Sequence, residues 1–322
     1  MSQANTEDAR HFQEAFGRLV NNVEVEVVGK RSIIELAFIA MLSRGHLLLE
    51  DVPGTGKTSL ARAMGASISG TSSRIQFTPD LLPGDVTGIT VYDQKERTFE
   101  FHPGPIFANV VLADEINRAS PKTQSALLEV MEEGQVTVDG TSRSVGVPFL
   151  VVATQNPVEQ AGTYRLPEAQ LDRFLLRTAL GYPDTAATME ILQRAGGARP
   201  QTRPVMDPQE VLNMIDIASR IYVAPSVADY VARLVEATRS ATQVRLGASV
   251  RGALGLLGAA KTRAASRGRH YVIPDDVAAL AGPVLAHRLI LDPEAEFDGV
   301  TAEAVVDQIL LDTVPPAQGA SA

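Results

Sequence analysis

The chain has 322 residues, of which 45% are hydrophobic and 21% charged, the ordinary mix of a globular protein large enough for more than one core. It contains no cysteine, which excludes disulfides, thiolate metal sites and a cysteine nucleophile. The net charge of −9 argues against a protein that grips a nucleic-acid backbone, because each phosphate contact calls for a lysine or an arginine.

The sequence predicts neither a secretion signal nor a membrane span. The first eight residues have no apolar core and no basic flank. The most apolar stretch, residues 33–42, is interrupted by Glu35 and is far shorter than the roughly 20 residues that a spanning helix needs. We therefore expect a cytoplasmic protein that is not embedded in a membrane.

Residues 24–183 alternate short β-rich apolar runs with helical stretches, which is the rhythm of a parallel sheet covered by helices. One of the helices is well delimited, because Ser120 can cap it, Pro121 suits its first turn and Gly134 can end it. The expected strands are His46–Glu50, Arg74–Thr78, Asn109–Asp114, Phe149–Thr154 and Leu175–Leu180.

Two β-hairpins interrupt this rhythm and are not needed to complete a five-stranded sheet. The first joins residues 89–92 to 98–101 through the polar turn 93–97. The second leads from residues 136–138 into Asp139-Gly140, a strong two-residue turn signal, and is expected to return at 145–147.

The rest of the chain divides into an N-terminal helical or flexible segment (1–23), an almost wholly helical region (184–314) and a disordered tail (315–322). Residues 196–208 have the composition of a linker or long loop. The expected helices after it are 209–221, 226–241, 249–266 and 274–288.

The sharpest motif is Leu47–Thr58, in which an apolar strand leads into a tight turn and then into a helical pattern. Two glycines in the turn let backbone N–H groups point at an anion, and the helix adds the positive end of its dipole. Lys57 is expected to reach the β- and γ-phosphates, and the Thr58 hydroxyl to bind Mg²⁺. Asp51 stands where the general pattern begins with glycine. The residues expected to hold the nucleotide are Pro53, Gly54, Thr55, Gly56, Lys57, Thr58 and Ser59.

A second apolar strand ends in two acids, Asp114 and Glu115. The carboxyl ends of parallel strands line the ligand crevice, so Asp114 is expected to hold Mg²⁺ beside the phosphate loop. Glu115 would polarise the water that attacks the γ-phosphate, and Asn156, after the next strand, would orient that water. Two acids or an Asn-Pro pair alone are common at solvated turns, so their position in the sheet carries this interpretation.

With these motifs the chain resembles the MoxR family of AAA+ ATPases over about residues 24–290. The specific stretches are Phe77–Pro83, Ala113–Ala119 and Leu166–Phe174. The resemblance implies an α/β fold, a P-loop NTPase core of the AAA+ type with a five-stranded parallel sheet, inserted β-hairpins and a C-terminal all-α lid. The hairpins would be the helix-2 insert and the hairpin before sensor 1, which mark a clade containing MCM helicases, magnesium-chelatase motor subunits and dynein.

The resemblance also implies Mg²⁺-dependent ATP hydrolysis by a homo-oligomer, usually a hexameric ring, with ATP at each interface between subunits. A neighbouring subunit would supply an arginine finger. Arg173 is our choice for it, with Arg118 and Arg165 as alternatives, and a surface salt bridge is the plainer interpretation of Arg173.

In the lid, Arg251 would be the sensor 2 arginine. Family members usually have Ser-Pro-Arg at this place, whereas this chain has Val250 before Arg251, which leaves the start of the helix less fixed. Val28 and Gly29, before the first helix of the core, would contact the adenine.

MoxR relatives act as chaperone-like motors that assemble or activate protein complexes. Their usual partners contain von Willebrand factor A domains, and maturation of a metal centre is a frequent outcome. The resemblance therefore implies this role, with ATP and Mg²⁺ as cofactors.

Three alternatives stay open. A nucleic-acid-dependent motor would share the hairpins, but the acidic charge and the scarcity of aromatic residues in the hairpin tips speak against it, so no stable nucleic-acid binding is expected. The basic run 261–269 is better explained as a solvated helix face. A nucleotide-binding scaffold without turnover would commonly lack the acid at Glu115. A magnesium-chelatase-like motor subunit is disfavoured by the three family-specific stretches.

Overall fold

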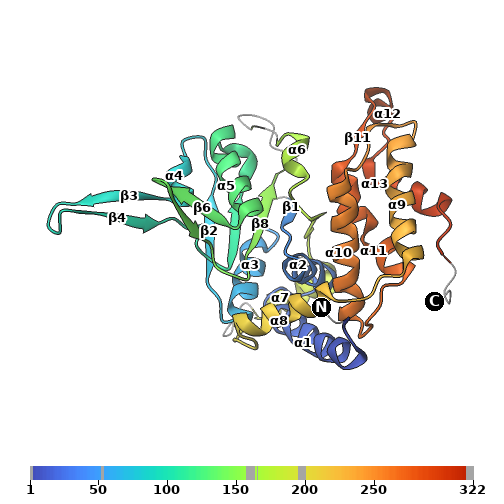
Figure 1. The fold of residues 1–322 in the computed structure, drawn as a ribbon, viewed down its shortest axis with the longest axis horizontal. Helices are drawn as coiled ribbons and strands as arrows, with labels where there is room; N and C mark the ends of the chain where they lie inside the picture. The colour runs from blue at the N-terminus through green and yellow to red at the C-terminus, as the bar shows by residue number, and fades with distance from the viewer. Residues whose placement is uncertain (1–2, 52–53, 157–163, 165, 195–200, 317–322) are drawn as a thin grey trace. The chain divides into compact units, whose positions relative to one another are not determined.

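A computed structural model of the protein describes residues 3–51, 54–156, 164, 166–194 and 201–316 (Figure 1). The chain forms two compact units, which we call the α/β unit (Arg18–Leu166 and Thr178–Leu212) and the helical unit (Met1–Gly17, Pro167–Arg177 and Asn213–Ala322). The segment Pro167–Arg177 belongs by its contacts to the helical unit, although it lies between stretches of the α/β unit in the sequence. The domain boundaries expected at 23/24, 183/184 and 314/315 stay predictions.

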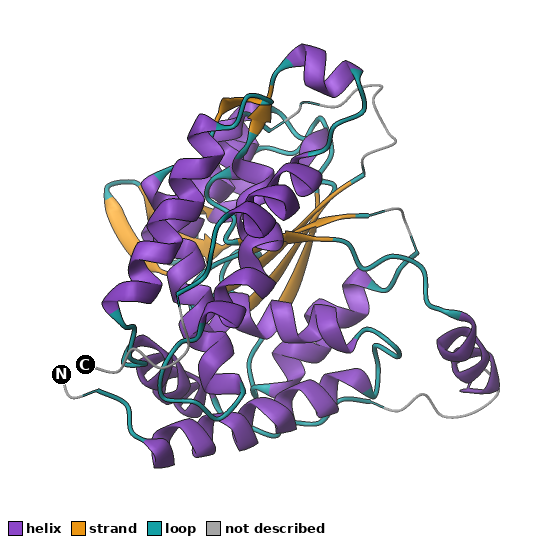
Figure 2. Ribbon diagram, turned by 90° about the vertical axis from the view of Figure 1, so that its right-hand side faces the viewer, coloured by secondary structure: helices purple, strands orange, loops and turns teal. Residues whose placement is uncertain are grey.

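A five-stranded sheet in the order β2-β5-β8-β1-β9 confirms the predicted α/β class. Strands β2 and β5, β5 and β8, and β8 and β1 pair in parallel, and Figure 2 shows the strands as a twisted fan. Every residue of β5 is buried, as expected for a strand covered on both faces. The strands are β1 (Leu47–Glu50), β2 (Ser72–Gln76), β5 (Val110–Asp114), β8 (Leu150–Gln155) and β9 (Leu176–Thr178).

All five strands differ by one or two residues from their predicted bounds, and a side chain explains one difference in β1 and one in β9. Strand β1 begins one residue late because the ring of His46, rather than its backbone, accepts the N–H of Val151 at 3.0 Å. Burial lowers the pKa of His46 to about 4, so the ring is neutral and Nε2 donates to the Met131 carbonyl at 2.9 Å. Strand β9 ends early because the N–H groups of Leu180 and Gly181 bind the Asp51 carboxylate.

The predicted start and end of α5 are confirmed. The Ser120 hydroxyl accepts from the N–H of Thr123, Pro121 opens the helix, and Gly134 closes it with φ 64°. Helix α3 packs against β2 and β5. The helices over the α/β part of the sequence are α1 (Thr6–Glu24), α2 (Arg31–Leu42), α3 (Lys57–Ser67), α4 (Pro83–Thr87), the 3-10 helix η1 (Ile116–Arg118), α5 (Pro121–Glu133) and α7 (Thr185–Arg194).

The two hairpins form their own two-stranded sheets, β3 (Gly88–Asp93) with β4 (Thr98–Pro103) and β6 (Gln135–Val138) with β7 (Thr141–Ser144). The prediction that the second hairpin returns at 145–147 was wrong. Asp139 and Gly140 both have positive φ, as a type I′ turn requires, so the return strand starts directly after them.

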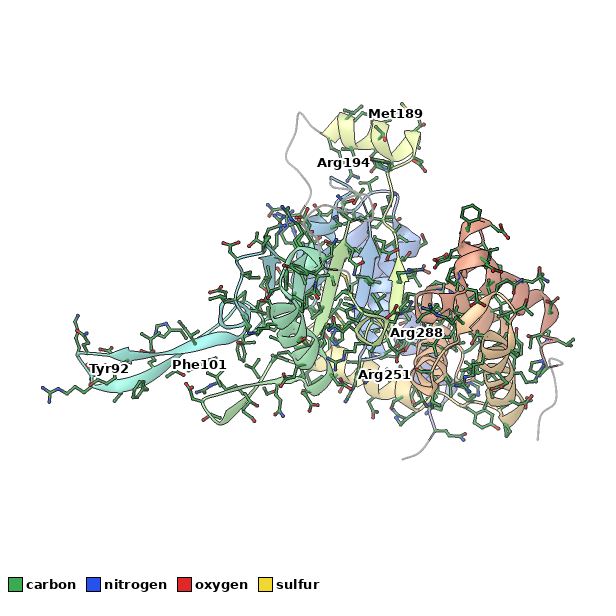
Figure 3. All side chains as sticks on the ribbon, turned by 90° about the horizontal axis from the view of Figure 1, so that it is seen from above. Tyr92, Phe101, Met189, Arg194, Arg251 and Arg288 are labelled. Atoms are coloured by element: carbon green, nitrogen blue, oxygen red, sulfur yellow. The ribbon has the colours of Figure 1, made fainter. Side chains whose placement is uncertain are left out.

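The turn of the first hairpin, residues 93–97, contains no aromatic residue, as expected, but an aromatic pair lies next to it. Tyr92 and Phe99 face each other one step from the turn, with ring centroids 5.2 Å apart. The side chain of Phe99 is 76% exposed. Figure 3 shows the hairpin, with Tyr92 and Phe101 labelled, extending away from the rest of the α/β unit.

The four helices expected after residue 208 are confirmed, each within three residues of its predicted bounds, and all but the first turn of α8 belong to the helical unit. The core of this unit includes Leu256, Ala259 and Ala260 of α10 and Val277 and Leu280 of α11. A short antiparallel pair, β10 (Val244–Leu246) with β11 (Ile290–Leu291), was not predicted. The remaining elements are α6 (Glu168–Leu171), α8 (Pro208–Ser219), α9 (Pro225–Ser240), α10 (Val250–Ser266), α11 (Pro274–Leu285), η2 (Ala286–Arg288), α12 (Pro293–Phe297) and α13 (Ala302–Asp312).

Candidate functional site

The turn between β1 and α3 has the backbone form that the phosphate-loop motif requires. Gly54 and Gly56 have φ of 87° and 101°, a region that other residues adopt only under strain. Gly56 directly precedes the first residue of α3, so the free N–H groups of this helix start at the turn. Thr55 is buried, Thr58 is exposed and Ser59 is half-buried. Pro53 lies outside the described residues.

Asp51 explains the departure from the general motif. Its buried carboxylate accepts from the N–H groups of Leu180 and Gly181 at 2.7 and 3.0 Å. Its own N–H donates to the Gln155 carbonyl at 3.0 Å, and its carbonyl accepts from the Lys57 ammonium at 3.4 Å. Asp51 therefore ties the start of the turn to the chain that follows β9, a link that glycine has no side chain to make.

The two acids at the end of β5 are held by different sets of partners. Asp114 accepts from the Thr154 hydroxyl and from the Arg74 guanidinium, both at 2.6 Å. Glu115 accepts from the Gln76 amide at 2.8 Å and from the Arg118 guanidinium at 2.9 Å. The side chains of Arg74 and Arg118 are 51% and 39% exposed, so water reaches the arginine of each pair, whereas the side chains of Asp114 and Glu115 are 10% and 19% exposed.

Thr154 is a site residue that the sequence analysis missed. It is fully buried on β8, next to β5, and its hydroxyl accepts from the N–H of Glu115 at 2.9 Å while it donates to Asp114. Glu115 has a left-handed backbone, φ 58° and ψ 48°, and this hydrogen bond helps to hold it there. The available signal was a lone hydroxyl at the end of an otherwise apolar strand.

Asn156 follows the last residue of β8, and Glu50 of β1 pairs with Gln155. Because β1, β5 and β8 are parallel neighbours, their carboxyl ends meet at one edge of the sheet. The structure therefore brings together the phosphate-loop residues, Asp114, Glu115 and Asn156 in the α/β unit.

The turn at Val28 and Gly29 packs within the same unit. Gly29 has φ 71°, and a Cβ atom built on it would lie 2.7 Å from the Cβ of Ala187. The Lys30 ammonium donates to the Tyr182 carbonyl at 2.7 Å. Close packing therefore requires glycine here, next to the predicted adenine contact.

The predicted arginines separate into three groups. Arg118 contacts Glu115 within the α/β unit, and Arg165 lies outside the described residues. Arg173, which is half-buried, and Arg251, which is exposed, both belong to the helical unit. Helix α10 begins at Val250 despite the missing proline, because the Ser249 hydroxyl caps it by accepting from the N–H of Gly252 at 3.3 Å.

A parallel sheet with a glycine turn between β1 and a helix, and two acids at the end of β5, two places from β1 in the same sheet, define a P-loop nucleotide-binding protein. Residues 46–176 match the ATPase family associated with various cellular activities (AAA), and residues 236–309 match the AAA lid domain.

The chain is 48% identical over 304 residues to the protein YeaC of Bacillus subtilis (strain 168), covering 94% of this chain and 95% of YeaC. It is 43% identical over 302 residues to Chaperone MoxR1 of Mycobacterium tuberculosis, covering 91% of this chain and 80% of MoxR1. The crystal structure of a proposed ATPase from Cytophaga hutchinsonii superposes with a TM-score of 0.90 at 38% identity, covering 96% of each chain.

The chain therefore belongs to the MoxR family of AAA+ ATPases. It is an ATPase, and the AAA domain implies that it binds a nucleotide. Within the described ranges, every helix is too short or too polar to cross a membrane.

Proposed function

We propose that ATP is hydrolysed at the carboxyl ends of β1, β5 and β8, with Mg²⁺, and that a second copy of the chain completes the site. The observation that supports this best is the pair of acids at the end of β5. Strand β5 is separated from β1, the strand that leads into the phosphate loop, by β8 alone, and both acids are held by arginines that water already reaches. These arginines can leave for a ligand at small cost, because their guanidinium groups are already partly hydrated while the acids are bound.

The turn from Gly54 to Gly56 and the first residues of α3 would bind the phosphates through backbone N–H groups. Lys57 would leave the Asp51 carbonyl, a long contact at 3.4 Å, for β- and γ-phosphate oxygens. Val28 and Gly29 would contact the adenine.

Thr58 and Asp114 would hold Mg²⁺. One hydroxyl and one carboxylate suit this ion, which takes its other ligands from water and phosphates. Among the described residues no group of three His, Asp or Glu side chains could hold a metal ion, so we expect the ion to arrive with the nucleotide. When bound, it would neutralise charge on the β- and γ-phosphates.

Glu115 would act as the general base. Its carboxylate would release Arg118 and accept a proton from the attacking water, while Gln76 keeps its contact to the same side chain. Asn156, at the end of the neighbouring strand, would orient this water and distinguish ATP from ADP.

Arg173 would act on the ATP of a neighbouring copy as the arginine finger, within a hexameric ring. Arg251 would respond to the nucleotide from the lid. Arg118 is the weaker candidate for the finger because it already contacts Glu115 of its own chain. Contacts that differ between the ATP and ADP states let hydrolysis shift a conformational equilibrium.

We propose a cytoplasmic, chaperone-like role in which ring motion assembles or activates a partner complex, as the name Chaperone MoxR1 suggests for that relative. The partner would be a protein with a von Willebrand factor A domain, and maturation of a metal centre would be one outcome. These finer points rest on the family resemblance.

A nucleic-acid motor remains the main alternative, and the exposed Tyr92–Phe99 pair favours it more than the sequence did. The basic run on α10 weakens it, because Lys261 donates to the Ser219 carbonyl at 2.7 Å and Arg269 pairs with Asp276 at 2.6 Å. DNA-stimulated hydrolysis would favour that alternative. A scaffold without turnover and a magnesium-chelatase-like subunit have no observation of their own in their favour.

The deciding experiment measures ATPase rate against protein concentration, with sizing by light scattering, for the parent, Arg173→Ala and Arg233→Ala. Arg233 is an exposed arginine of the helical unit that pairs with Asp229, so it is the matched control. We expect activity per chain to rise with assembly, and Arg173→Ala to assemble but lose on the order of 10³-fold in kcat. Activity that is independent of concentration and survives Arg173→Ala would contradict the shared site.

A further inference from the structure

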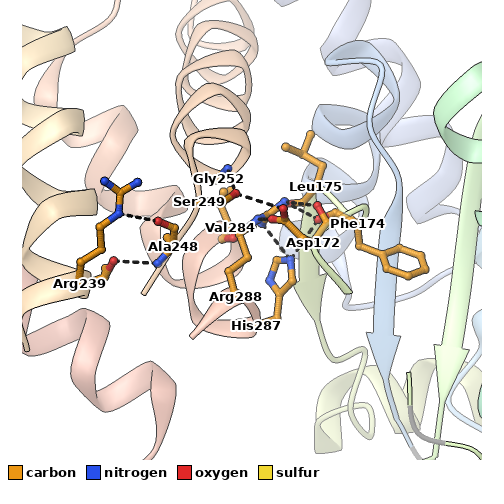
Figure 4. A network of polar contacts seen from close by, with 11 residues as sticks. Asp172, Phe174, Leu175, Arg239, Ala248, Ser249, Gly252, Val284, His287 and Arg288 are labelled. Carbon is orange, nitrogen blue, oxygen red and sulfur yellow. Dashed lines mark hydrogen bonds and ion pairs between the residues drawn. The ribbon is translucent and has the colours of Figure 1, made fainter. Parts of the chain in front are cut away.

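A buried arginine of the helical unit uses its whole guanidinium to hold the chain around Arg173 (Figure 4). The Arg288 side chain is only 3% exposed, and its Nε donates to the Asp172 carboxylate at 2.7 Å. Its Nη2 donates to the carbonyls of Asp172 and Phe174 at 3.1 and 2.7 Å. Its Nη1 donates to the Leu175 carbonyl at 3.3 Å and also to the Val284 carbonyl.

These bonds fall on both sides of Arg173. The carbonyls of Asp172 and Phe174 flank it directly, and the ring of Phe174 is fully buried. The backbone at Arg173 is therefore fixed before any partner binds. Such preorganisation matters for a catalytic group, because an error of about 1 Å in placement can cost 10²-fold in rate.

The same carboxylate reaches the first turn of α10. Asp172 accepts from the Ser249 hydroxyl at 3.1 Å, and this hydroxyl also caps α10. Arg251 lies two residues further along, in that first turn. Figure 3 labels Arg251 and Arg288 together in the helical unit. A displacement of the start of α10 would thus be passed through Ser249 to Asp172, next to Arg173.

The charges around Arg288 are consistent with its contact to Asp172. Burial lowers the pKa of Arg288, the Asp172 carboxylate opposes that shift, and the positive charge of Arg251 adds to it. The Nε2 atom of His287 lies 3.0 Å from the Phe174 carbonyl and 2.9 Å from the Arg288 guanidinium, and burial keeps the pKa of His287 well below the usual value, so the ring adds no charge. Asp172 thus has a buried cation on one side and the helix carrying Arg251 on the other.

We propose that Asp172 and Arg288 are positioning residues for Arg173. Together with Ser249 they couple Arg173, which acts on the ATP of the neighbouring copy, to the first turn of α10, which contains Arg251. The inference rests on the proposed function, in which Arg173 acts in trans. It adds a route by which the nucleotide bound to one copy would alter hydrolysis in the next.

The plainer interpretation is a structural tie with no effect on Arg173. The helical unit holds such a tie nearby, because Arg177 pairs with Glu303 of α13 four residues after Arg173. Glu303→Gln is therefore the matched control for Asp172→Asn. Each substitution turns a carboxylate that binds an arginine into an amide, and only one of them touches the residues that flank Arg173.

The test compares Asp172→Asn, Arg288→Lys, Arg173→Ala and Glu303→Gln in assembled full-length protein, using ATP hydrolysis and binding of a fluorescent ATP analogue. We expect Asp172→Asn and Arg288→Lys to lower kcat by about 10- to 100-fold with unchanged analogue affinity. Glu303→Gln should hydrolyse like the parent. If Arg288→Lys fails to fold by circular dichroism, Asp172→Asn decides the outcome.

Rings assembled from two variants then distinguish two causes of a lower rate. The substitution can misplace the Arg173 that acts on the neighbouring copy, or it can damage the ATP site of its own chain. Mixing Asp172→Asn with Glu115→Gln, which keeps an intact Arg173, should restore roughly a quarter of the parent rate, because half of the sites keep Glu115 and half of those face an intact arginine. Mixing Asp172→Asn with Arg173→Ala should restore nothing.

Normal hydrolysis by Asp172→Asn, beside an inactive Arg173→Ala, would overturn this inference and leave the proposed function standing. An inactive Asp172→Asn that Glu115→Gln does not rescue would also overturn it, since the defect would then lie in its own site. A fully active Arg173→Ala would instead remove the proposed function and this inference together.

Discussion

In both units acidic side chains pair with arginines, but the arginines are partly exposed in the α/β unit and the arginine is buried in the helical unit. At the end of β5, Asp114 and Glu115 pair with arginines whose side chains are 51% and 39% exposed. In the helical unit, Asp172 pairs with an arginine that is 3% exposed and also binds four carbonyls. An exposed pair can give way to a ligand, whereas a buried one fixes the backbone around it. Whether the arginine is exposed or buried therefore decides what the ion pair does. With an exposed arginine the acid can exchange its partner for a ligand, and with a buried arginine the pair holds the neighbouring backbone in place.

The largest effect should come from Glu115→Gln. The amide cannot accept the proton of the attacking water, so we expect kcat to fall on the order of 10²- to 10⁴-fold with little loss of ATP affinity. Single-turnover hydrolysis and equilibrium binding of an ATP analogue measure the two quantities separately. A parent-like rate would remove Glu115 from catalysis.

Next in size is the stability of the buried pair. Arg288→Met leaves the Asp172 carboxylate and several carbonyls without their donor, so we expect a loss of about 3–5 kcal/mol in the free energy of unfolding. Arg74→Met, the control in the α/β unit, should lose less than Arg288→Met, because the Arg74 guanidinium is half exposed and the buried Asp114 carboxylate keeps the Thr154 hydroxyl. Urea unfolding followed by circular dichroism measures both. Equal losses in the free energy of unfolding would show that burial of the arginine makes no difference to the strength of the two ion pairs.

Thr154→Val tests the buried hydroxyl that contacts both acids at the end of β5. Valine has the shape of threonine but leaves the Glu115 N–H and the Asp114 carboxylate without the hydroxyl, at a cost of about 1–3 kcal/mol. We expect a fall in kcat of about tenfold, measured by steady-state hydrolysis. Thr154→Ser keeps the hydroxyl and should stay close to the parent.

The smallest effect is expected for Arg74→Gln. Removing the cation that occupies Asp114 should lower the Mg²⁺ concentration needed for half-maximal hydrolysis by a few-fold, on the scale of an exposed ion pair. Arg62→Gln, which breaks the exposed Arg62–Glu26 pair of the same unit, is the control. A higher Mg²⁺ requirement in Arg74→Gln would mean that Arg74 supports the site instead of competing for it.

The sequence predicted those parts of the fold and site that depend on neighbours in the chain. The strands, the caps of α5 and the acids after β5 each follow from a local pattern, and all were placed within a few residues. Side chains that act across the fold escaped prediction. The ring of His46 shortened β1, and the carboxylate of Asp51 ended β9 early. Arg288 and Asp172 are 116 residues apart, so no local pattern could join them.

The exposed aromatic pair at the tip of the β3–β4 hairpin is a suitable place for a fluorescent probe. The chain contains no tryptophan, so Phe99→Trp would introduce a single indole at a side chain that is 76% exposed in one copy. Its emission maximum and its quenching by acrylamide would then report on the surroundings of the hairpin alone. A blue shift on addition of nucleotide, or of a partner protein, would show that the tip becomes covered, without any label attached to the chain.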